Sequence, residues 1–273
     1  MNRIVRATAI VIGLTTLALA CSRAPYTKRI QFNLIPNGIM NGIGKTAYTS
    51  MLGENKVARG SDNARTLTQV GRRIASAADE PKFKWEYSLI QEDTVNAWCL
   101  PGGKIGFYTG ILPVLENEAG MAFVMGHEVG HATARHGAER LSQQLALLGG
   151  LVGLEVYLSN ESQLTTAQRA AILGAIGLGA EVGVMLPFSR AHESEADIIG
   201  LMYMSNAGYP PEESVKMWDR MAALGGSSMP TFLSTHPPHE KRKENLREWM
   251  PKARKRYQRN ALNHDTLVTL WEQ

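Results

Sequence analysis

The chain has 273 residues, of which 29 are basic and 25 acidic, so its formal net charge is only +4. This near balance, without any nucleic-acid-binding motif, gives no support for nucleic-acid binding. About 250 residues remain once an N-terminal targeting segment is removed, a length that suits a single domain with a good core.

The N-terminus predicts a signal peptide over residues 1–20. Arg3 and Arg6 form a basic start, and residues 7–20 are apolar but too short to span a bilayer comfortably. The sequence ALAC, which ends at Cys21, permits simple cleavage after an AxA pattern or lipidation of the cysteine as in bacterial lipoproteins. We favour the lipoprotein, held to the membrane by lipid on Cys21 and compatible with an outer membrane. Simple cleavage and a retained anchor helix remain alternatives.

Residues 21–52 are predicted to be a lipid-anchored tether and lead-in loop, because Gly, Asn, Pro and Ser are frequent there. If Cys21 carries lipid, no intrachain disulfide can form, since Cys99 is the only other cysteine. A free Cys21 would permit a bridge to Cys99 in an oxidising compartment. Otherwise burial in an apolar strand is the default role of Cys99.

Hydrophobic periodicity predicts one helix, three strands and then a mainly helical remainder. The expected elements are an amphipathic helix over 56–78, strands over 83–90, 94–100 and 105–108, a tight turn at 101–104, and helices from 110 onward. The hairpin over 94–108 has two interpretations. It is the structural edge of a sheet, or an exposed strand that pairs with extended substrate through backbone hydrogen bonds.

The segment 126–131 reads GHEVGH inside a stretch, 118–136, that is predicted to be helical. His127 and His131 are four residues apart, so they project from one face of a helix within reach of one Zn²⁺. Glu128 lies beside the first histidine, where a carboxylate can take a proton from metal-bound water. An ordinary surface helix would carry the same pattern. The apolar residues before it favour a buried helix instead, and buried His and Glu need partners.

Residues 145–158 and 170–186 are apolar and rich in Gly and Ala. Each stretch contains a glutamate and falls short of about 18 uninterrupted apolar residues. We expect a helical hairpin that packs on the catalytic domain or dips into a membrane interface. A contact between subunits is the third alternative.

A catalytic zinc site needs a third protein ligand, and the segment 189–197 offers the best candidates. Glu193 and Asp197 are four residues apart and share one helical face, whereas Glu195 points elsewhere. We predict Glu193 as the third ligand and Asp197 as a carboxylate that orients a ligand histidine. His192 competes for the ligand role but lies about 100° round the helix from Glu193. An acidic, solvated helix start is the alternative that involves no metal.

Basic residues gather near the C-terminus, at Lys252, Arg254, Lys255, Arg256 and Arg259. A solvated helix face is the favoured interpretation. Attraction to anionic lipid headgroups is the alternative for a protein tethered to a membrane.

Several segments together resemble one family, the zinc metallopeptidases of the CAAX prenyl protease, HtpX and Oma type, with periplasmic BepA- and LoiP-like members. The matching segments are HEVGH at 127–131, ESEAD at 193–197, NAWCLPGGKI at 96–105, YTGIL at 108–112, RHGAER at 135–140 and THPPHEKR at 235–242. They occur in the order that the family shows, and the resemblance as a whole extends from about residue 55 to 250. Within this resemblance, the 135–140 segment is the tail of the active-site helix and the 94–108 hairpin is a substrate-binding strand.

The resemblance implies an α+β, mainly helical fold of the gluzincin type over residues 53–273, with a small antiparallel sheet beside the HExxH helix. It implies one zinc ion bound by three residues and a general base between the two histidines. The ligands are His127, His131 and Glu193, and the base is Glu128.

Two further residues have roles that the resemblance leaves open. Asp197 matches an acidic residue that donates a proton or orients a ligand. His236 matches a histidine that approaches the metal, as an inhibitory fourth ligand or as a group that steadies the oxyanion; capping a turn before Pro237 is its plainer role. We expect His136 and His239 to serve packing and surface roles.

The predicted function is a membrane-tethered, zinc-dependent endopeptidase on the periplasmic face of the bacterial envelope. Its expected substrates, by resemblance, are misfolded or stalled envelope proteins. A chaperone-like outer-membrane assembly factor is the second hypothesis, with proteolysis kept latent by His236. A zinc amidase acting on peptidoglycan is the third, and it is weaker because the sequence has no wall-binding repeat.

Overall fold

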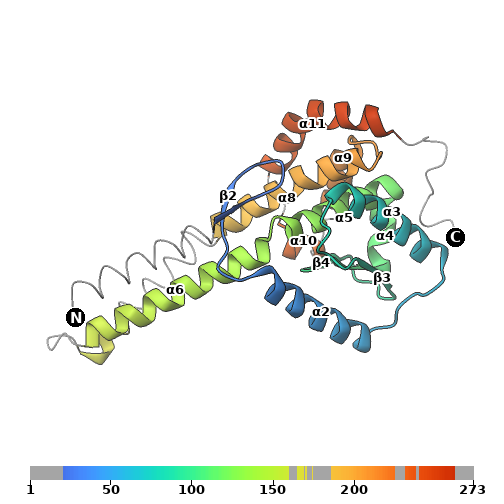
Figure 1. The fold of residues 1–273 in the computed structure, drawn as a ribbon. Coiled ribbons are helices and arrows are strands. Elements are labelled where there is room, and N and C mark those ends of the chain that lie inside the picture. The colour runs from blue at the N-terminus through green and yellow to red at the C-terminus, as the bar shows by residue number, and fades with distance from the viewer. Residues whose placement is uncertain are drawn as a thin grey trace.

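The computed structural model describes residues 21–159, 165–168, 170, 174, 186–224, 231–237 and 240–261 (Figure 1). In chain order the elements are β1 (Cys21–Arg23), β2 (Ile30–Phe32), α2 (Asn37–Glu54), α3 (Asp62–Ala78), β3 (Glu86–Ile90), β4 (Ala97–Leu100), β5 (Lys104–Tyr108), the 3₁₀ turn η1 (Thr109–Ile111), α4 (Leu112–Leu115), α5 (Glu118–Thr133), α6 (His136–Ser159), α8 (Leu186–Asn206), α9 (Glu213–Ala223), α10 (Thr231–Thr235) and α11 (Glu240–Asn260). The predicted α+β, mainly helical class is confirmed.

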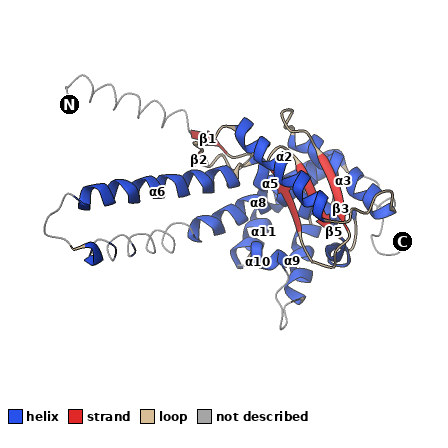
Figure 2. Ribbon diagram, turned by 90° about the horizontal axis from the view of Figure 1, so that it is seen from below, coloured by secondary structure: helices blue, strands red, loops and turns tan. Residues whose placement is uncertain are grey.

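A three-stranded sheet in the order β3-β5-β4 lies beside α5 (Figure 2). β4 and β5 form the predicted antiparallel hairpin, and β3 runs parallel to β5, so the whole sheet is mixed. Neighbouring residues Tyr87 and Ser88 face opposite sides of β3. The ring of Tyr87 lies on Gly71 of α3, whereas Ser88 hydrogen-bonds Tyr48 of α2, which also contacts Trp98 edge-on. Helices therefore cover both faces, and β4 is an edge strand.

Residues 21–52 are not the lead-in loop that their composition predicts. β1 and β2 pair as an antiparallel hairpin, and α2 takes up most of the remaining segment. Tertiary packing holds this helix: Met40, Gly44 and Tyr48 are buried, and Gly44 lies against the backbone of Pro101. These contacts outweigh the weak helix propensity of a glycine-rich segment. Lipidation of the N-terminal cysteine stays a prediction, and the signal peptide lies outside the described residues.

Helix α3 begins later than its periodicity predicts, at Asp62 instead of Lys56. The side chain of Ser61 accepts a hydrogen bond from the backbone N–H of Ala64, which caps the helix. The preceding residues run beside β3 instead, where Val57 forms a β-bridge with Ile90.

Helix α5 also ends earlier than predicted, at Thr133. Arg135 has a φ of 53°, in the left-handed region that few residues other than glycine adopt. Its guanidinium donates a hydrogen bond of 2.6 Å to the carbonyl of Ile35, which holds the bend. The segment 135–140 is therefore the start of a new helix, α6, and it turns His136 back toward α5.

Helix α6 projects from the rest of the protein (Figures 1 and 2). Leu145, Leu148 and Val152 are exposed, so the alternative in which residues 145–158 pack on the catalytic domain is wrong. Of the described helices, only α6 is long and apolar enough to cross a membrane, a test that core helices of soluble proteins also pass. The interface alternative stays a prediction, and the expected second arm, 170–186, lies almost wholly outside the described residues.

The basic residues near the C-terminus lie on α11 and are mostly exposed. Arg254 pairs with Glu212, and Arg256 donates to the side chain of Asn206. This arrangement agrees with a solvated helix face.

Helices α5 and α8 cross at glycines. A Cβ atom on Gly126 would lie 2.8 Å from the carbonyl oxygen of Gly200, and one on Gly200 would lie 2.6 Å from the backbone nitrogen of His127. Gly130 faces the backbone of Ala196 in the same way, at 3.1 Å. These small residues let two helices approach closely and so bring their side chains into one site.

We expect Gly200→Ala to lower the free energy of unfolding by about 1–3 kcal/mol, because the added methyl overpacks this crossing. Denaturant unfolding measures the change. Gly149→Ala is the matched control, because nothing lies within 4 Å of the Cβ position of Gly149 in the projecting part of α6. Alanine should be tolerated there or stabilise the helix. Unfolding curves that coincide for the Gly200 variant and the wild type would contradict the proposed tight crossing.

Candidate metal centre

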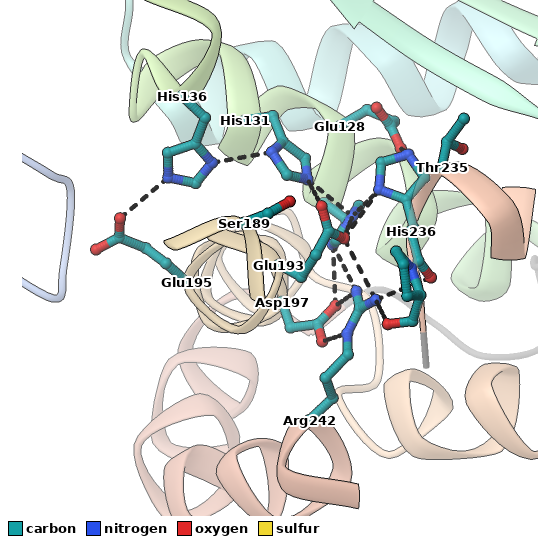
Figure 3. A network of polar contacts seen from close by, with 12 residues as sticks. Glu128, His131, His136, Ser189, Glu193, Glu195, Asp197, Thr235, His236 and Arg242 are labelled. Atoms are coloured by element: carbon teal, nitrogen blue, oxygen red, sulfur yellow. Dashed lines mark hydrogen bonds and ion pairs between the residues drawn. The ribbon is translucent and has the colours of Figure 1, made fainter. Parts of the chain in front are cut away.

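Four side chains from three parts of the chain converge at one point (Figure 3). His127 and His131 come from α5, Glu193 from α8 and His236 from the residue after α10, and one potential ligand atom of each lies within 4.8 Å of the others. The Nε2 atoms of the two α5 histidines are 3.1 Å apart. The carboxylate of Glu193 reaches both, at 3.3 Å from Nε2 of His131 and 3.4 Å from Nε2 of His127.

This donor set fits zinc, which binds imidazole nitrogen and carboxylate oxygen. Burial lowers the pKa of His131 to about 3, so its imidazole is neutral and has a lone pair to offer. Burial alone would raise the pKa of Glu193, but the contacts with His131, His127 and His236 hold it well below its usual range. An ionised carboxylate and a neutral imidazole are the forms that bind a metal.

Glu128 lies beside the four groups and is 3% exposed. Its Oε1 atom is 3.3 Å from Nε2 of His236 but makes no hydrogen bond with the described residues. Leaving a buried carboxylate oxygen without a donor is costly. The arrangement suits an oxygen that accepts a proton from water in the site.

His236 lies inside the cluster and not merely at a turn. Its Nδ1 atom is 2.9 Å from Oε2 of Glu193 and 3.2 Å from Nε2 of His127. Its backbone N–H donates to the carbonyl of Phe232, which continues the last turn of α10. The ring thus contacts two predicted metal ligands and Glu128 at once.

Behind His127 lies a buried ion pair. Oδ1 of Asp197 is 2.9 Å from Nδ1 of His127, and Arg242 of α11 contacts both oxygens of Asp197, at 2.5 and 2.8 Å. Burial would raise the pKa of Asp197, but the charge and hydrogen bonds of Arg242 lower it. Burial would likewise lower the pKa of His127, but Asp197 and Glu193 raise it to about 9, so metal binding must displace a proton from this histidine. Arg242 is a site residue without a role in the sequence analysis, although it is the arginine of the THPPHEKR segment.

His136 is the second residue whose role the sequence analysis missed. It is buried, with Nδ1 2.9 Å from Nδ1 of His131 and Nε2 3.0 Å from Oε2 of Glu195. The competing ligand His192 stacks on this ring, with centroids 4.1 Å apart, and is not one of the four convergent groups. His239 lies outside the described residues.

A pocket of about 370 Å³ opens onto the centre. The edge strand β4 contributes Cys99 and Leu100 to its wall, which His131, Glu193 and His236 also line. Burial raises the pKa of the Cys99 thiol well above its usual range, which favours the neutral thiol over the thiolate.

Comparison with known proteins extends these observations. Residues 61–250 match the model of peptidase family M48. The chain is 33% identical to the mitochondrial metalloendopeptidase OMA1 of Schizosaccharomyces pombe over 247 residues, which cover 89% of this chain and 70% of that protein. It is 40% identical to OMA1 of Saccharomyces cerevisiae over 186 residues, covering 65% and 50% of the two chains. It is 29% identical to the beta-barrel assembly-enhancing protease of Escherichia coli over 183 residues, covering 64% and 36%.

The chain thus spans half or less of the last two relatives. All the predicted site residues lie inside the family match, which covers more than half of this chain. The donor set agrees with the zinc dependence of such peptidases, and peptidase activity implies protein substrates. The chain therefore belongs to peptidase family M48 and is a zinc-dependent metalloendopeptidase.

Proposed function

We propose that this protein is a membrane-tethered endopeptidase of the bacterial cell envelope that hydrolyses misfolded or stalled envelope proteins. The observation that carries the proposal is the convergence of three histidines and one glutamate, with the buried Glu128 beside them and a pocket walled by an edge strand that opens onto the group. The signal-peptide pattern before Cys21 supports the tether. Similarity to a relative named for β-barrel assembly supports the envelope, and a mitochondrial setting like that of the OMA1 relatives is the competing location.

In this proposal His127, His131 and Glu193 hold one zinc ion. When bound, zinc lowers the pKa of a coordinated water toward about 7 and polarises a substrate carbonyl. Glu128 takes the proton from the attacking water and passes it to the leaving amine. Asp197 accepts a hydrogen bond from Nδ1 of His127 and so keeps its Nε2 turned toward the metal.

Strand β4 is the proposed substrate-binding element. It is an edge strand of the sheet, and Cys99 and Leu100 from it line the pocket beside the metal centre. An extended peptide that added itself to this edge would be held through its main chain. Such pairing tolerates many sequences, as cleavage of misfolded proteins requires.

Cleavage of casein by the purified, zinc-loaded protein tests the endopeptidase function. We expect fragments that disappear when a chelator removes the metal and return when zinc is restored. A protein that binds one zinc per chain but leaves casein intact under all these conditions would count against the proposed function. It would favour the second candidate.

That candidate is a chaperone-like outer-membrane assembly factor with latent proteolysis. The position of His236 favours it, because Nδ1 lies within reach of the proposed ligands and can complete a fourth, inhibitory coordination.

Replacing His236 by Ala separates the two functions. If His236 is an inhibitory ligand, the variant cleaves casein faster and binds zinc more weakly. If it steadies the oxyanion, cleavage falls by about 10²–10³-fold and the zinc affinity is unchanged. Casein turnover and zinc titration are measured on the same preparation. A variant identical to the wild type in both measurements would contradict both roles.

A further inference from the structure

The N-terminal hairpin reaches the metal centre through buried polar contacts. Arg29, just before β2, donates from Nε to Oε2 of Glu195 at 2.9 Å. Its two terminal nitrogens donate to the oxygens of Glu139 at 2.9 and 2.8 Å. The neighbouring Gln31 donates from Nε2 to the carbonyl of Ala134, where α5 ends. The hairpin is thus tied both to α8 and to the junction of α5 and α6.

These contacts continue to a metal ligand. For Nε2 of His131 to face a metal, its Nδ1 must carry the proton, which it then donates to Nδ1 of His136. His136 consequently carries its own proton on Nε2 and donates it to Glu195. The same oxygen of Glu195 accepts from Nε of Arg29. Donors and acceptors match at every step from the hairpin to the ligand.

We propose that Arg29 and His136 are positioning residues of the metal centre: Arg29 fixes Glu195, Glu195 fixes His136, and His136 orients the imidazole of His131. This inference rests on the proposed assignment of His131 as a ligand. The segment before α2 would then support the metal centre in addition to its proposed role as a tether.

The other ligand histidine has the same kind of support. Nδ1 of His127 faces Asp197, and Asp197 is fixed by Arg242 from α11. Each ligand histidine is therefore supported by a carboxylate whose charge an arginine neutralises. Asp197 contacts His127 directly, whereas Glu195 reaches His131 through the imidazole of His136.

Burial explains why the arginine matters to the position of Glu195. Glu139 is 1% exposed and Glu195 4% exposed, so two carboxylates lie together away from water. Arg29 bridges them. Removing one partner of a buried ion pair leaves a charge uncompensated, and the remaining groups rearrange to find solvent or new donors. Glu195 would then no longer hold the ring of His136.

The test compares Arg29→Ala, Glu195→Leu and His136→Phe in the protein of residues 1–273 purified in detergent; leucine at 195 removes the acceptor of His136. The zinc dissociation rate is followed with a chromophoric chelator, and kcat and KM for casein are measured with excess zinc. Partners behind a metal ligand are worth 10–100-fold in metal affinity or activity, so we expect zinc to leave about 10–100-fold faster. We also expect kcat to fall while KM stays unchanged in the Arg29 and Glu195 variants, because neither residue lines the pocket beside β4.

Arg23→Ala is the control, because Arg23 lies on the same hairpin, is exposed and, within the described part of the chain, donates only to the carbonyl of Lys28. His136→Asn supplies the conservative rescue, since its amide oxygen can accept from Nδ1 of His131 near the position of the imidazole nitrogen. It should hold zinc far better than His136→Phe. His136→Asn and His136→Phe leave the contacts of Arg29 in place, so they test the positioning role even if Arg29→Ala does not fold. The double variant of Arg29→Ala and His136→Phe should lose no more than either single variant.

Zinc kinetics and kcat that match the Arg23 control in all three test variants would overturn the inference. The inference is also overturned if His136→Asn releases zinc as fast as His136→Phe. His131→Ala distinguishes this failure from failure of the proposed site. If that variant still binds zinc as tightly as the wild type, the ligand assignment itself is wrong. If it loses zinc while the three test variants do not, only the positioning role is wrong.

Discussion

Replacing Glu128 by Gln is expected to abolish peptide hydrolysis while zinc remains bound. The amide is nearly the same size as the carboxylate but cannot take a proton from water, and loss of a general base costs about 10²–10⁴-fold in rate. Glu128 is not among the four groups that can hold the metal, so its replacement leaves the ligands in place. Casein turnover and zinc stoichiometry, measured on the same sample, give the two halves of the result.

Glu193→Gln is the matched control for this experiment, because it makes the same chemical change at a buried glutamate of the same site. Its Oε1 and Oε2 atoms face His131 and His127, so the control should lose zinc together with activity. The contrast between the two variants distinguishes a general base from a metal ligand. A Glu128→Gln variant that releases zinc, or one that cleaves casein at the rate of the wild type, would show that the base is misassigned.

The convergent part of the site was predictable because helical geometry is local. Residues four apart share a face whatever the rest of the chain does, so His127 with His131, and Glu193 with Asp197, could be paired without a structure. Glycines at 126 and 130 are what such a close helix crossing requires, and the backbone of α8 lies against both. The hairpin of β4 and β5 was equally predictable, because a tight turn separates two short strands.

The N-terminal segment could not be predicted in the same way. Glycine and asparagine near residues 37–42 locally favour a loop, and the contacts that override this tendency come from far along the chain. Arg29 meets Glu139 and Glu195, which are 110 and 166 residues away. A single sequence does not reveal which distant residues pair, so from the sequence Arg29 cannot be told apart from a solvent-exposed arginine.

The same limit explains why the sequence predicts only a packing or surface role for His136. A continuous helix through residue 136 would carry it away from the metal face of α5, since five residues are not a whole number of turns. The bend at Arg135 changes its direction and brings Nδ1 to His131. The left-handed conformation of Arg135, held by its hydrogen bond to the carbonyl of Ile35, thus places His136 beside His131.

Replacing Arg242 by Ala is expected to cause the largest loss of stability, about 3–5 kcal/mol in the free energy of unfolding, because it leaves a buried charge unpaired. Asp197 is 0% exposed and Arg242 is 1% exposed. Arg242 also lies 3.9 Å from the ring centroid of Trp218 and donates to the carbonyl of His236. Its loss should therefore loosen His236 and weaken zinc binding as well as the fold. Denaturant unfolding and zinc titration measure the two effects.

Two further variants identify the cause of that loss. Arg242→Lys keeps the positive charge but lacks the planar fork that contacts both oxygens of Asp197, so an intermediate stability is expected. Combining Arg242→Leu with Asp197→Asn removes both charges while the amide oxygen can still accept from Nδ1 of His127. It should recover much of the stability lost in Arg242→Ala, since replacing a whole buried ion pair is far less costly than breaking it. If the double variant is as unstable as Arg242→Ala, packing against Trp218 or the ion pair with Glu193, and not the charge of Asp197, is what requires the arginine.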